Sequence, residues 1–385
     1  MSSAPQDELF MQRALELAQE TTALASPNPQ VGCVLVRNKE IIGEGAHLYA
    51  NYDHAEIVAL KQAAAQGIAP KGATAYVTLE PCSHHGRTGP CADALIAAGI
   101  ARCVIATTDP NPQVSGRGIA KLQAAGIEVA IGVLQQPARD LNEAFAHFIR
   151  TRTPFVTLKA ALSVDGKLAP PPASRFPNQP HWLTGPAARA EVHLLRHASD
   201  AILTGIGTVL ADNPLLTDRS GKPRRRPLLR VILDTPLRIP LDSQLVLSAS
   251  SVRGTTPDLL ILCGTPAPPE KITALESLGI EVEPLPDHAG RLSLPAALSA
   301  LAERNILSLL LECGSHLNGS FLRQNLVDKA TLIYAETELG DQALPFAQGI
   351  PSSYLFEQSL TSITRTTLDS DAFVTGYLHD PWPQP

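Results

Sequence analysis

The sequence predicts an α/β protein of two domains, and three observations support this prediction. The chain has 385 residues, which is more than one hydrophobic core usually serves. Short apolar runs typical of strands alternate with segments of helical periodicity along most of the chain. A short polar tract with one proline, Arg150–Phe155, interrupts this alternation. We therefore expect one domain over residues 1–150 and another over residues 151–385.

In the first domain, five segments carry helical patterns and five carry strand patterns. The helices are expected at 7–24, 54–67, 91–99, 118–126 and 138–149. The strands are expected at 31–36, 41–47, 73–79, 102–108 and 127–133. Strands that alternate with helices in this way predict a three-layer domain, with helices on both faces of one sheet.

The second domain repeats this order in kind but not in sequence. Strands are expected at 155–163, 200–206, 229–235, 258–264, 308–313, 329–336 and within 361–378. Helices are expected at 186–199, 269–278, 294–304 and 315–325. The triplet Arg224–Arg226 falls in a polar loop, and we interpret it as a solvated surface turn.

Composition narrows the class of function. The hydrophobic fraction is 44% and the charged fraction is 18%, which is typical of a folded globular protein. The net charge of −6 and the aromatic fraction of 4% argue against a protein that coats nucleic acid. The chain shows neither a signal peptide nor an apolar run that could span a membrane. We therefore expect a cytoplasmic protein with a small-molecule substrate and without nucleic-acid or membrane partners.

The six cysteines occur in two settings. Cys33, Cys103 and Cys263 lie inside apolar runs, and we expect them to be buried core thiols. Cys82 and Cys91 are instead flanked by proline, glycine, serine and histidine. In a reducing compartment, neighbouring cysteines and histidines indicate a metal site rather than a disulfide.

The segments around these two cysteines predict a catalytic zinc site. "His54-Ala55-Glu56", "Pro81-Cys82" and "Pro90-Cys91" match the zinc-deaminase signature, with eight residues instead of two between the cysteines. Catalytic zinc takes three protein ligands and keeps a position for water, so we predict His54, Cys82 and Cys91 as ligands. We predict that Glu56 takes the proton of the activated water and passes it to the substrate.

Other interpretations of this segment remain open. His84 or His85 could complete a closed structural zinc site, but we favour them, with Arg87, as donors to an anionic substrate group. His47 is either a surface residue or a pocket donor. A zinc-stabilised nucleotide-binding protein without catalysis would not need Glu56. A nucleic-acid base deaminase fits poorly with the acidic balance and the few aromatic residues.

Motifs along nearly the whole chain resemble a known family, the bifunctional riboflavin-biosynthesis enzymes. Its deaminase half resembles SPNPQVGCVLV, GEGAH, HAEIVAL, TLEPCSHHGRTGPC and DPNPQVSGRG. Its reductase half resembles LKAALSVDGK, HWLTG, ILTGIGTVLADNPLLTDR, RVILDT and LLLECGSHLNGSFL. The resemblance implies a cytidine-deaminase-like domain followed by a dihydrofolate-reductase-like domain, in a homo-oligomer. It also implies zinc-dependent deamination of 2,5-diamino-6-ribosylamino-4(3H)-pyrimidinone 5′-phosphate, followed by NADPH-dependent reduction of the ribosyl group to ribityl, which gives 5-amino-6-ribitylamino-uracil 5′-phosphate.

The resemblance also implies site residues. By position, His54, Cys82 and Cys91 match the zinc ligands, and Glu56 matches the proton shuttle. NADPH is expected to contact Leu162, Trp182, Thr208, Asp212, Thr235, Gly314, Ser315, His316, Leu317, Asn318, Gly319 and Ser320. Substrate is expected to contact Asn28, His47, His84, Lys159, Pro180, Arg196, Leu216, Arg219 and Glu312.

Two expectations, the binding of a pyrophosphate and of the substrate phosphate, also have a chemical basis. At two positions, however, the sequence departs from the family pattern. The strand, glycine turn and helix start in ECGSHLNGSFL form a natural cradle for a pyrophosphate. Arg196 and Arg219 are expected to bind the substrate phosphate bidentately. Pro180 stands where the family often has serine, after a loop longer than usual. Cys313 stands where glycine is frequent.

Overall fold

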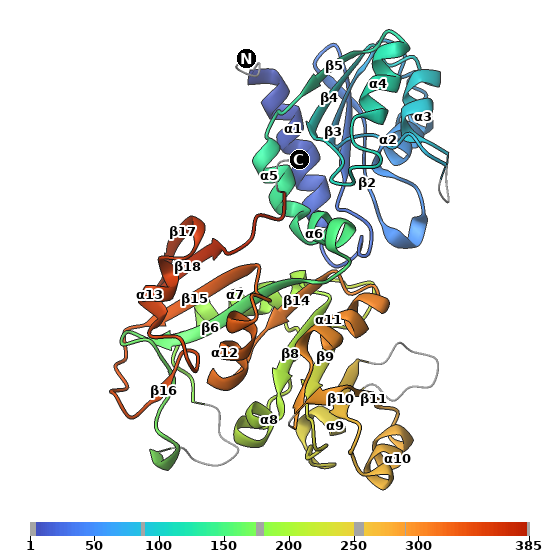
Figure 1. Ribbon diagram of the computed structural model, residues 1–385. Coiled ribbons are helices and arrows are strands. Elements are labelled where there is room, and N and C mark those ends of the chain that lie inside the picture. Colours follow the sequence, from blue (N-terminus) through green and yellow to red (C-terminus); the bar gives the residue numbers. More distant parts are fainter. Residues whose placement is uncertain (1–4, 86–88, 175–180, 250–257, 289, 383–385) are drawn as a thin grey trace. The chain divides into compact units, whose positions relative to one another are not determined.

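The chain forms two compact units in a computed structural model that describes residues 5–85, 89–174, 181–249, 258–288 and 290–382 (Figure 1). The first unit is Met1–Arg152 with two short later segments, Pro223–Arg225 and Trp382–Pro385. The second unit is Thr153–Lys222 with Arg226–Pro381. Among the described helices, none is both long enough and apolar enough for a membrane crossing.

The first unit is built on a five-stranded sheet with the order β2-β1-β3-β4-β5. β1 runs antiparallel to both of its neighbours, and β3, β4 and β5 are parallel. These are the five strands expected from the sequence. Their bounds are β1 (Gly32–Arg37), β2 (Glu40–Ala46), β3 (Thr74–Leu79), β4 (Arg102–Thr107) and β5 (Glu128–Ile131).

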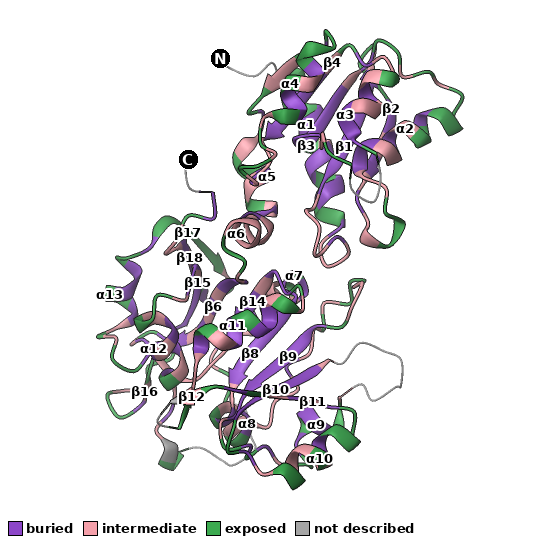
Figure 2. Cartoon of the chain, turned by 45° about the vertical axis from the view of Figure 1, so that its right-hand side comes forward, coloured by how far each residue is buried: buried purple, intermediate pink, exposed green. Residues whose placement is uncertain are grey.

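Helices cover both faces of this sheet, which confirms the three-layer prediction (Figure 2). Side chains alternate along β1, so Cys33 and Leu35 pack toward α2, α3 and α4, whereas Val34 and Val36 pack toward α1 and α5. The helices are α1 (Pro5–Glu20), the short η1 (Tyr49–Asn51), α2 (Ala55–Ala65), α3 (Cys91–Ala97), α4 (Arg117–Ala124), α5 (Gln135–Leu141) and α6 (Glu143–Thr151).

The prediction of one helix over 138–149 is wrong. The segment forms two helices, α5 and α6, that meet at Asn142. The Asn142 side chain accepts a hydrogen bond from the Gln30 backbone N–H at 2.8 Å and donates one to the Gln30 carbonyl at 2.9 Å. Asparagine often bonds backbone in this way at the expense of helix continuity, so a tertiary contact sets the break.

Close packing of α2 on β2 fixes where the helix lies. A Cβ atom at Gly43 would lie 2.4 Å from the carbonyl oxygen of Ala59, and one at Gly45 would lie 2.7 Å from that of Ala55. Only glycine therefore allows the helix backbone to touch the strand. This contact places the first turn of α2, which carries the predicted metal site, at one end of the sheet.

The second unit is built on a nine-stranded sheet with the order β11-β10-β9-β8-β14-β6-β15-β18-β17. The strands from β11 to β15 are parallel, and β18 and β17 are antiparallel additions. The edge strand β11 escaped the sequence prediction because it is short and holds two glutamates and a proline. The strands are β6 (Phe155–Ser163), β8 (Ala201–Gly205), β9 (Leu229–Leu233), β10 (Leu259–Gly264), β11 (Glu281–Leu285), β14 (Ser308–Leu311), β15 (Lys329–Ala335), β17 (Thr361–Leu368) and β18 (Asp371–Tyr377).

Two hydrophobic layers flank this sheet, one on each face. Helices α7 (Pro186–Ala198), α8 (Ile206–Asp212), α9 (Gln244–Leu247) and α10 (Pro269–Ser277) pack on one face. Helices α11 (Leu294–Glu303), α12 (Ser315–Arg323) and α13 (Ser353–Glu357) pack on the other. The remaining short elements are η2 (Pro172–Ser174), β7 (Lys167–Ala169), β12 (Asp287–His288), β13 (Arg291–Leu292) and β16 (Leu344–Pro345). Both units are thus α/β layers, as the sequence predicted.

Two predictions about single residues have opposite outcomes. Cys33, Cys103 and Cys263 are fully buried free thiols, which confirms their assignment to the core. The interpretation of Arg224–Arg226 as a solvated turn is wrong for Arg225 and Arg226. Arg225 is half-buried, donates to the Ser26 carbonyl at 2.9 Å and lies over the Tyr49 ring. The Arg226 guanidinium lies 3.0 Å from the Asp200 carboxylate and also donates to the backbone oxygen of Asn305.

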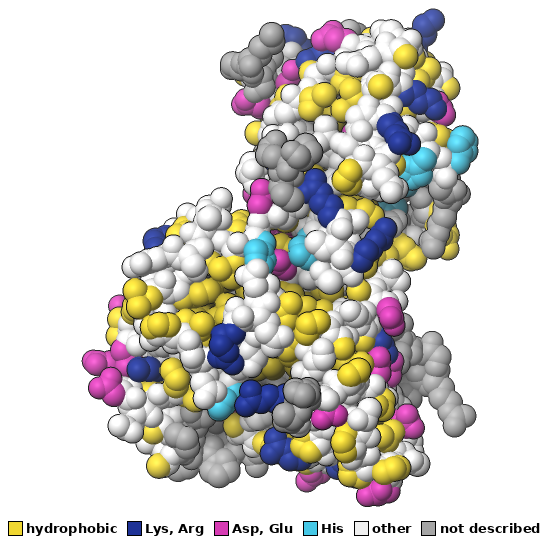
Figure 3. Space-filling view, in the orientation of Figure 1, with side chains coloured by type: hydrophobic (Ala, Val, Ile, Leu, Met, Phe, Trp, Pro, Cys, Tyr) yellow, Lys and Arg dark blue, Asp and Glu magenta, His cyan; other side chains and the backbone are white. Residues whose placement is uncertain are grey.

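Charged side chains of both signs are mixed over the surface. On the face that Figure 3 shows, lysine and arginine alternate with aspartate and glutamate across each unit. The broad basic stripe that characterises nucleic-acid binding is not seen among the described residues of that face. This distribution agrees with the acidic net charge.

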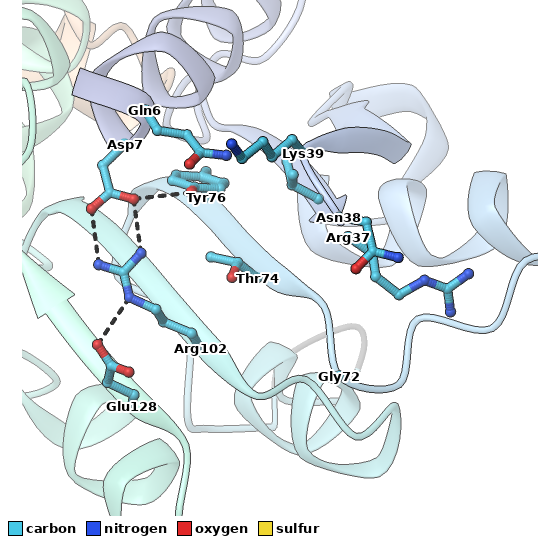
Figure 4. Close-up of a pocket in the computed structure, with 11 residues that line it drawn as sticks. Gln6, Asp7, Arg37, Asn38, Lys39, Gly72, Thr74, Tyr76, Arg102 and Glu128 are labelled. Carbon is cyan, nitrogen blue, oxygen red and sulfur yellow. Dashed lines mark hydrogen bonds and ion pairs between the residues drawn. The ribbon is translucent and has the colours of Figure 1, made fainter. Parts of the chain in front are cut away.

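A polar pocket of about 410 Å³ lies where β3 and β4 of the first unit begin (Figure 4). Inside it, the Asp7 carboxylate accepts two hydrogen bonds from Arg102, at 2.8 and 2.9 Å, and one from the Tyr76 hydroxyl at 2.9 Å. Arg102 also donates to Glu128 at 3.0 Å. The carboxylates of Asp7 and Glu128 are therefore both paired with the Arg102 guanidinium. The pocket lies at the start of β3, whereas Cys82 follows the end of this strand.

This network predicts a pH-dependent contribution to stability. The Arg102 guanidinium lowers the pKa of Asp7 below its ordinary value of 3.8. A lowered folded-state pKa stabilises the protein above the ordinary pKa, and the contribution is lost as the pH falls through the folded-state value. We expect Asp7→Asn to reduce the free energy of unfolding at pH 7 by about 1.5–3 kcal/mol. The deficit should shrink in acid, as followed by circular dichroism during urea unfolding.

Asp93→Asn is the matched control, because Asp93 pairs with Lys121 while both side chains are more than a third exposed. Such surface pairs contribute less than about 1 kcal/mol. Equal losses in the two variants, or a loss in Asp7→Asn that does not change with pH, would contradict the role assigned to Asp7.

Candidate active sites

Three residues of the first unit bring potential metal ligands together. His54 Nδ1 lies 3.2 Å from Cys91 Sγ and 3.5 Å from Cys82 Sγ. All three ligand atoms lie within 4.8 Å of one another, and this is the only such group of His, Cys, Asp and Glu among the described residues. Ligands that share one tetrahedral zinc, with bonds of about 2.0–2.3 Å, are separated by about 3.5 Å.

Two helix starts and one strand end position these ligands. His54 is the N-cap of α2 and Cys91 is the first residue of α3, and neither helix has a side-chain cap. Cys82 follows β3 and accepts a hydrogen bond from the Cys91 backbone N–H at 3.3 Å. The positive ends of both helices therefore face the two sulfurs, which favours thiolates.

The ionisation of the two thiols shows why this group fits a cation. A hydrogen bond from Cys91 lowers the pKa of Cys82 to about 4. The pKa of Cys91 is raised by that same bond and by burial. Without added positive charge, the thiolate of Cys82 therefore disfavours ionisation of Cys91. A divalent ion would stabilise both, and two sulfurs with one imidazole form a donor set that suits zinc.

Glu56 lies beside the ligands but is not one of them. Its carboxyl is outside the group of converging ligand atoms, and the residue is only 3% exposed. Burial, followed by the charge of Cys82, raises the pKa of Glu56. A carboxyl with a raised pKa next to a metal site is suited to accepting and returning a proton.

Asn28 and His47, both predicted to contact substrate, form a bonded pair. The Asp53 carbonyl can only accept, so the His47 Nδ1 that lies 2.8 Å from it carries the proton. His47 Nε2 then accepts from Asn28 Nδ2 at 2.9 Å. Burial lowers the pKa of His47, which favours this neutral form. The pair fixes the Asn28 amide and leaves its oxygen for another donor.

The two histidines between the cysteines do not join the ligand group. His84 and His85 are exposed, and neither belongs to the group of converging ligands. Arg87 lies outside the described residues. The sequence reasoning missed Asp109, whose pKa is raised to about 6 by burial and by the nearby Glu80. Its place in the DPNPQVSGRG motif, directly after β4, was the available signal.

In the second unit, three strand ends gather the predicted cofactor residues. β8, β9 and β14 are neighbours and run parallel, so Gly205 at the end of β8, Thr235 after β9 and Gly314 after β14 lie at the same edge of the sheet. Gly205 and Gly314 are the extended N-caps of α8 and α12, and neither helix has a side-chain cap. Both helices therefore present free backbone N–H groups at this edge.

The start of α12 also holds polar atoms that lack partners. The Ser315 hydroxyl and the Asn318 amide oxygen are buried and have no hydrogen-bond partner among the described residues. A Cβ atom at Gly314 would have 3.8 Å of clearance to the Thr208 hydroxyl, so the turn is open to a ligand. Free N–H groups, a hydroxyl and an open glycine turn fit the phosphates of a dinucleotide.

The other predicted cofactor residues differ in accessibility. Trp182 is 66% exposed, with Arg189 over its ring. Thr208, Asp212, Thr235 and Leu317 are half-buried, and His316 is exposed. Leu162 is fully buried in the core, and Gly319 is packed against the carbonyl oxygen of Gln348. Leu162 and Gly319 therefore have a packing role in this structure.

The predicted substrate residues of the second unit centre on Glu312. Arg196 donates to both Glu312 oxygens, at 2.8 and 3.0 Å, and Lys159 Nζ lies 3.7 Å away. Burial alone would raise the pKa of Glu312, but Lys159 and Arg196 lower it to about 2. Arg196 thus binds Glu312 in a bidentate manner, and Arg219 is exposed. Contact of either arginine with the substrate phosphate stays a prediction. Leu216 is buried, and Pro180 lies outside the described residues.

Comparison with known proteins identifies a family for each part of the chain. Residues 4–107 match the cytidine and deoxycytidylate deaminase zinc-binding region, and residues 154–370 match the RibD C-terminal domain. The Escherichia coli riboflavin biosynthesis protein RibD is 43% identical over 88% of this chain and 90% of its own length.

Solved structures show the same relationship over nearly the whole chain. Acinetobacter baumannii RibD is 36% identical, with a TM-score of 0.80 over 97% of this chain and 98% of its own. The Thermotoga maritima diaminohydroxyphosphoribosylaminopyrimidine deaminase/5-amino-6-(5-phosphoribosylamino)uracil reductase is 34% identical, with a TM-score of 0.81 and the same coverage. The chain therefore belongs to the RibD family, the bifunctional deaminases and reductases of riboflavin biosynthesis.

Proposed function

We propose that the chain catalyses two successive steps, hydrolytic deamination in residues 1–150 and NADPH-dependent reduction in residues 151–385. The substrate is 2,5-diamino-6-ribosylamino-4(3H)-pyrimidinone 5′-phosphate, and the product is 5-amino-6-ribitylamino-uracil 5′-phosphate. The observation that carries the proposal is a ligand group with two thiols and one imidazole beside a separate buried carboxyl. A zinc-stabilised binding protein without catalysis would have no use for that carboxyl.

In the deaminase site, His54, Cys82 and Cys91 would hold the zinc ion. Zinc in such a site supplies Lewis-acid activation of a water molecule near neutral pH. Glu56 accepts one proton from this water and gives it to the pyrimidine ring nitrogen. It then takes the second proton, from the hydroxyl that has added to the ring carbon, and gives it to the departing ammonia as the C–N bond breaks. Asn28, held by His47, uses its free amide oxygen to orient the pyrimidine.

In the reductase site, the N-termini of α8 and α12, with Thr208 and Ser315, would hold the phosphates of NADPH. NADPH supplies the hydride that converts the ribosyl group to ribityl. Glu312 is held as an anion by Arg196 and Lys159, so it can accept hydrogen bonds from substrate hydroxyls. The Arg196 guanidinium already donates to both oxygens of Glu312. The exposed Arg219 is therefore better placed to bind the substrate phosphate.

We also infer that the protein works in the cytoplasm as a homo-oligomer. All six cysteines are free, and the two that face His54 must stay reduced to bind metal, which suits a reducing compartment. The oligomer follows only from the family resemblance.

The first prediction separates proton transfer from metal binding. Glu56→Gln should keep about one zinc per chain, because the carboxyl is not a ligand, yet ammonia release should fall by at least about a hundredfold. NADPH oxidation on deaminated substrate should be unchanged. Zinc is measured by elemental analysis, and the two activities are measured separately.

The controls for this prediction are substitutions of histidines. His84→Ala and His85→Ala should each retain zinc, whereas His54→Ala should lose it. Loss of zinc in the His84 or His85 variant would mean that the ligand set is wrong. Loss of both activities in Glu56→Gln would argue against separate sites.

The second prediction concerns the reductase. Arg196→Ala removes a bidentate partner of Glu312 and should raise the KM for the deaminated substrate by about tenfold or more, since hydrogen bonds to charged groups contribute about 1.5–3 kcal/mol. Ammonia release should be unaffected. Arg365→Ala is the control, because Arg365 also pairs with a glutamate but is 58% exposed. An unchanged KM in Arg196→Ala would remove this residue from the substrate site.

A further inference from the structure

The carboxylate of Glu80 is buried among backbone donors from a distant part of the first unit. Glu80 follows β3, lies two residues before Cys82 and is 5% exposed. Its Oε2 accepts from the N–H groups of Asp109 and Gly116, at 3.1 and 2.9 Å. Its Oε1 accepts from those of Gly118 and Ile119, at 2.9 and 3.3 Å. One side chain therefore organises both ends of the segment 109–119.

These bonds also complete the start of α4. The N-cap of this helix is Gly116, which has no side chain with which to cap. The N–H groups of Gly118 and Ile119 belong to the first turn of the helix and would otherwise lack an acceptor. Glu80 supplies the acceptor from another strand, with a negative charge where the helix dipole favours one.

A second contact joins α4 to the turn that contains Cys82. A Cβ atom at Gly118 would lie only 2.0 Å from the carbonyl oxygen of Pro81, so the backbone of α4 touches the Glu80–Cys82 turn directly. The Glu80 backbone N–H also donates to the Thr107 carbonyl at 2.9 Å, just before the loop begins. The loop and the ligand turn are therefore joined at several points.

The loop that Glu80 holds begins beside the turn that contains Cys82. β3 and β4 are parallel neighbours with Leu79 opposite Thr107, so the segments that follow them start at the same edge of the sheet. The carboxyl of Asp109, which opens the loop, accepts from the Asn111 N–H at 2.8 Å, and Asn111 in turn accepts from the Gln113 N–H at 3.0 Å. This internal bonding makes the loop compact, and Glu80 joins it to the Cys82 turn.

We propose that Glu80 is a positioning residue of the deaminase site. Its carboxylate fixes the wall formed by residues 109–116 relative to the Cys82 turn, so that the pocket has its shape before the substrate arrives. This inference rests on the deaminase function proposed above. Glu80 itself touches neither the metal ligands' coordinating atoms nor the reacting groups, and it acts through the loop.

The test is Glu80→Gln in the full-length, zinc-loaded chain. The amide of glutamine turns an N–H₂ group toward two backbone donors, so two of the four bonds are lost. We expect the KM for the diamino substrate to rise by about tenfold, with kcat changed by less than about threefold, because the lost interactions bind rather than transform the substrate. Zinc content and NADPH oxidation on deaminated substrate should stay at the wild-type level.

A merely structural role is excluded with a matched destabilised variant. Asp7→Asn also removes a buried charge from the first unit but lies at the opposite end of β3. Both variants are assayed well below their unfolding temperatures. A rise in KM confined to Glu80→Gln supports positioning. A KM that rises equally in the two variants, an unchanged KM or a loss of zinc in Glu80→Gln would each overturn it.

The outcome for the wild-type chain distinguishes the two proposals. A wild-type chain that releases ammonia, together with a Glu80→Gln variant that behaves like Asp7→Asn, overturns the positioning role alone. A zinc-loaded wild-type chain that releases no ammonia overturns the deaminase function, and the positioning role with it.

Discussion

The chemistry of the first unit depends on one electrostatic constraint. Two cysteine sulfurs and one imidazole nitrogen lie within 4.8 Å, and ionisation of one thiol disfavours ionisation of the other unless a cation compensates the charge. The backbone creates this constraint before any ion binds. His54 is the N-cap of α2, two glycines of β2 let this helix pack closely on the strand, and α3 begins at Cys91. The positive ends of both helices then reduce the cost of the negative charge.

The two units build their sites from the same structural feature but for different chemistry. In each, parallel strands end at one edge of the sheet, and helices without side-chain caps begin there. In the first unit, the helix ends face thiolates and, through Glu80, a buried carboxylate. In the second unit, they face the space beside Ser315 and Asn318, whose buried oxygens lack partners within the described part of the chain. Free backbone N–H groups at strand ends thus serve a metal site in one unit and a dinucleotide site in the other.

The metal ligands could be predicted because their residue types are rare and stand at fixed positions before helices. The central strands could be predicted because their apolar runs are continuous, whereas the short edge strand β11, with two glutamates and a proline, could not. Other features depend on contacts that residue types do not encode. Glu80 binds only backbone N–H groups, which every residue except proline offers. The break between α5 and α6 at Asn142 depends on a hydrogen bond with Gln30. The ion pair of Arg196 with Glu312 joins residues that are 116 positions apart in the sequence.

The most direct test is X-ray absorption spectroscopy of the purified zinc-loaded chain. The account predicts two sulfur ligands, one nitrogen ligand from histidine and one light-atom ligand exchangeable with solvent. Glu56→Gln should give the same spectrum. A shell with two sulfurs and two histidine nitrogens, or a spectrum that changes when Glu56 is replaced, would show that the site is closed or that the carboxylate binds the ion. Either result would contradict the division between ligands and proton carrier on which the deaminase assignment rests.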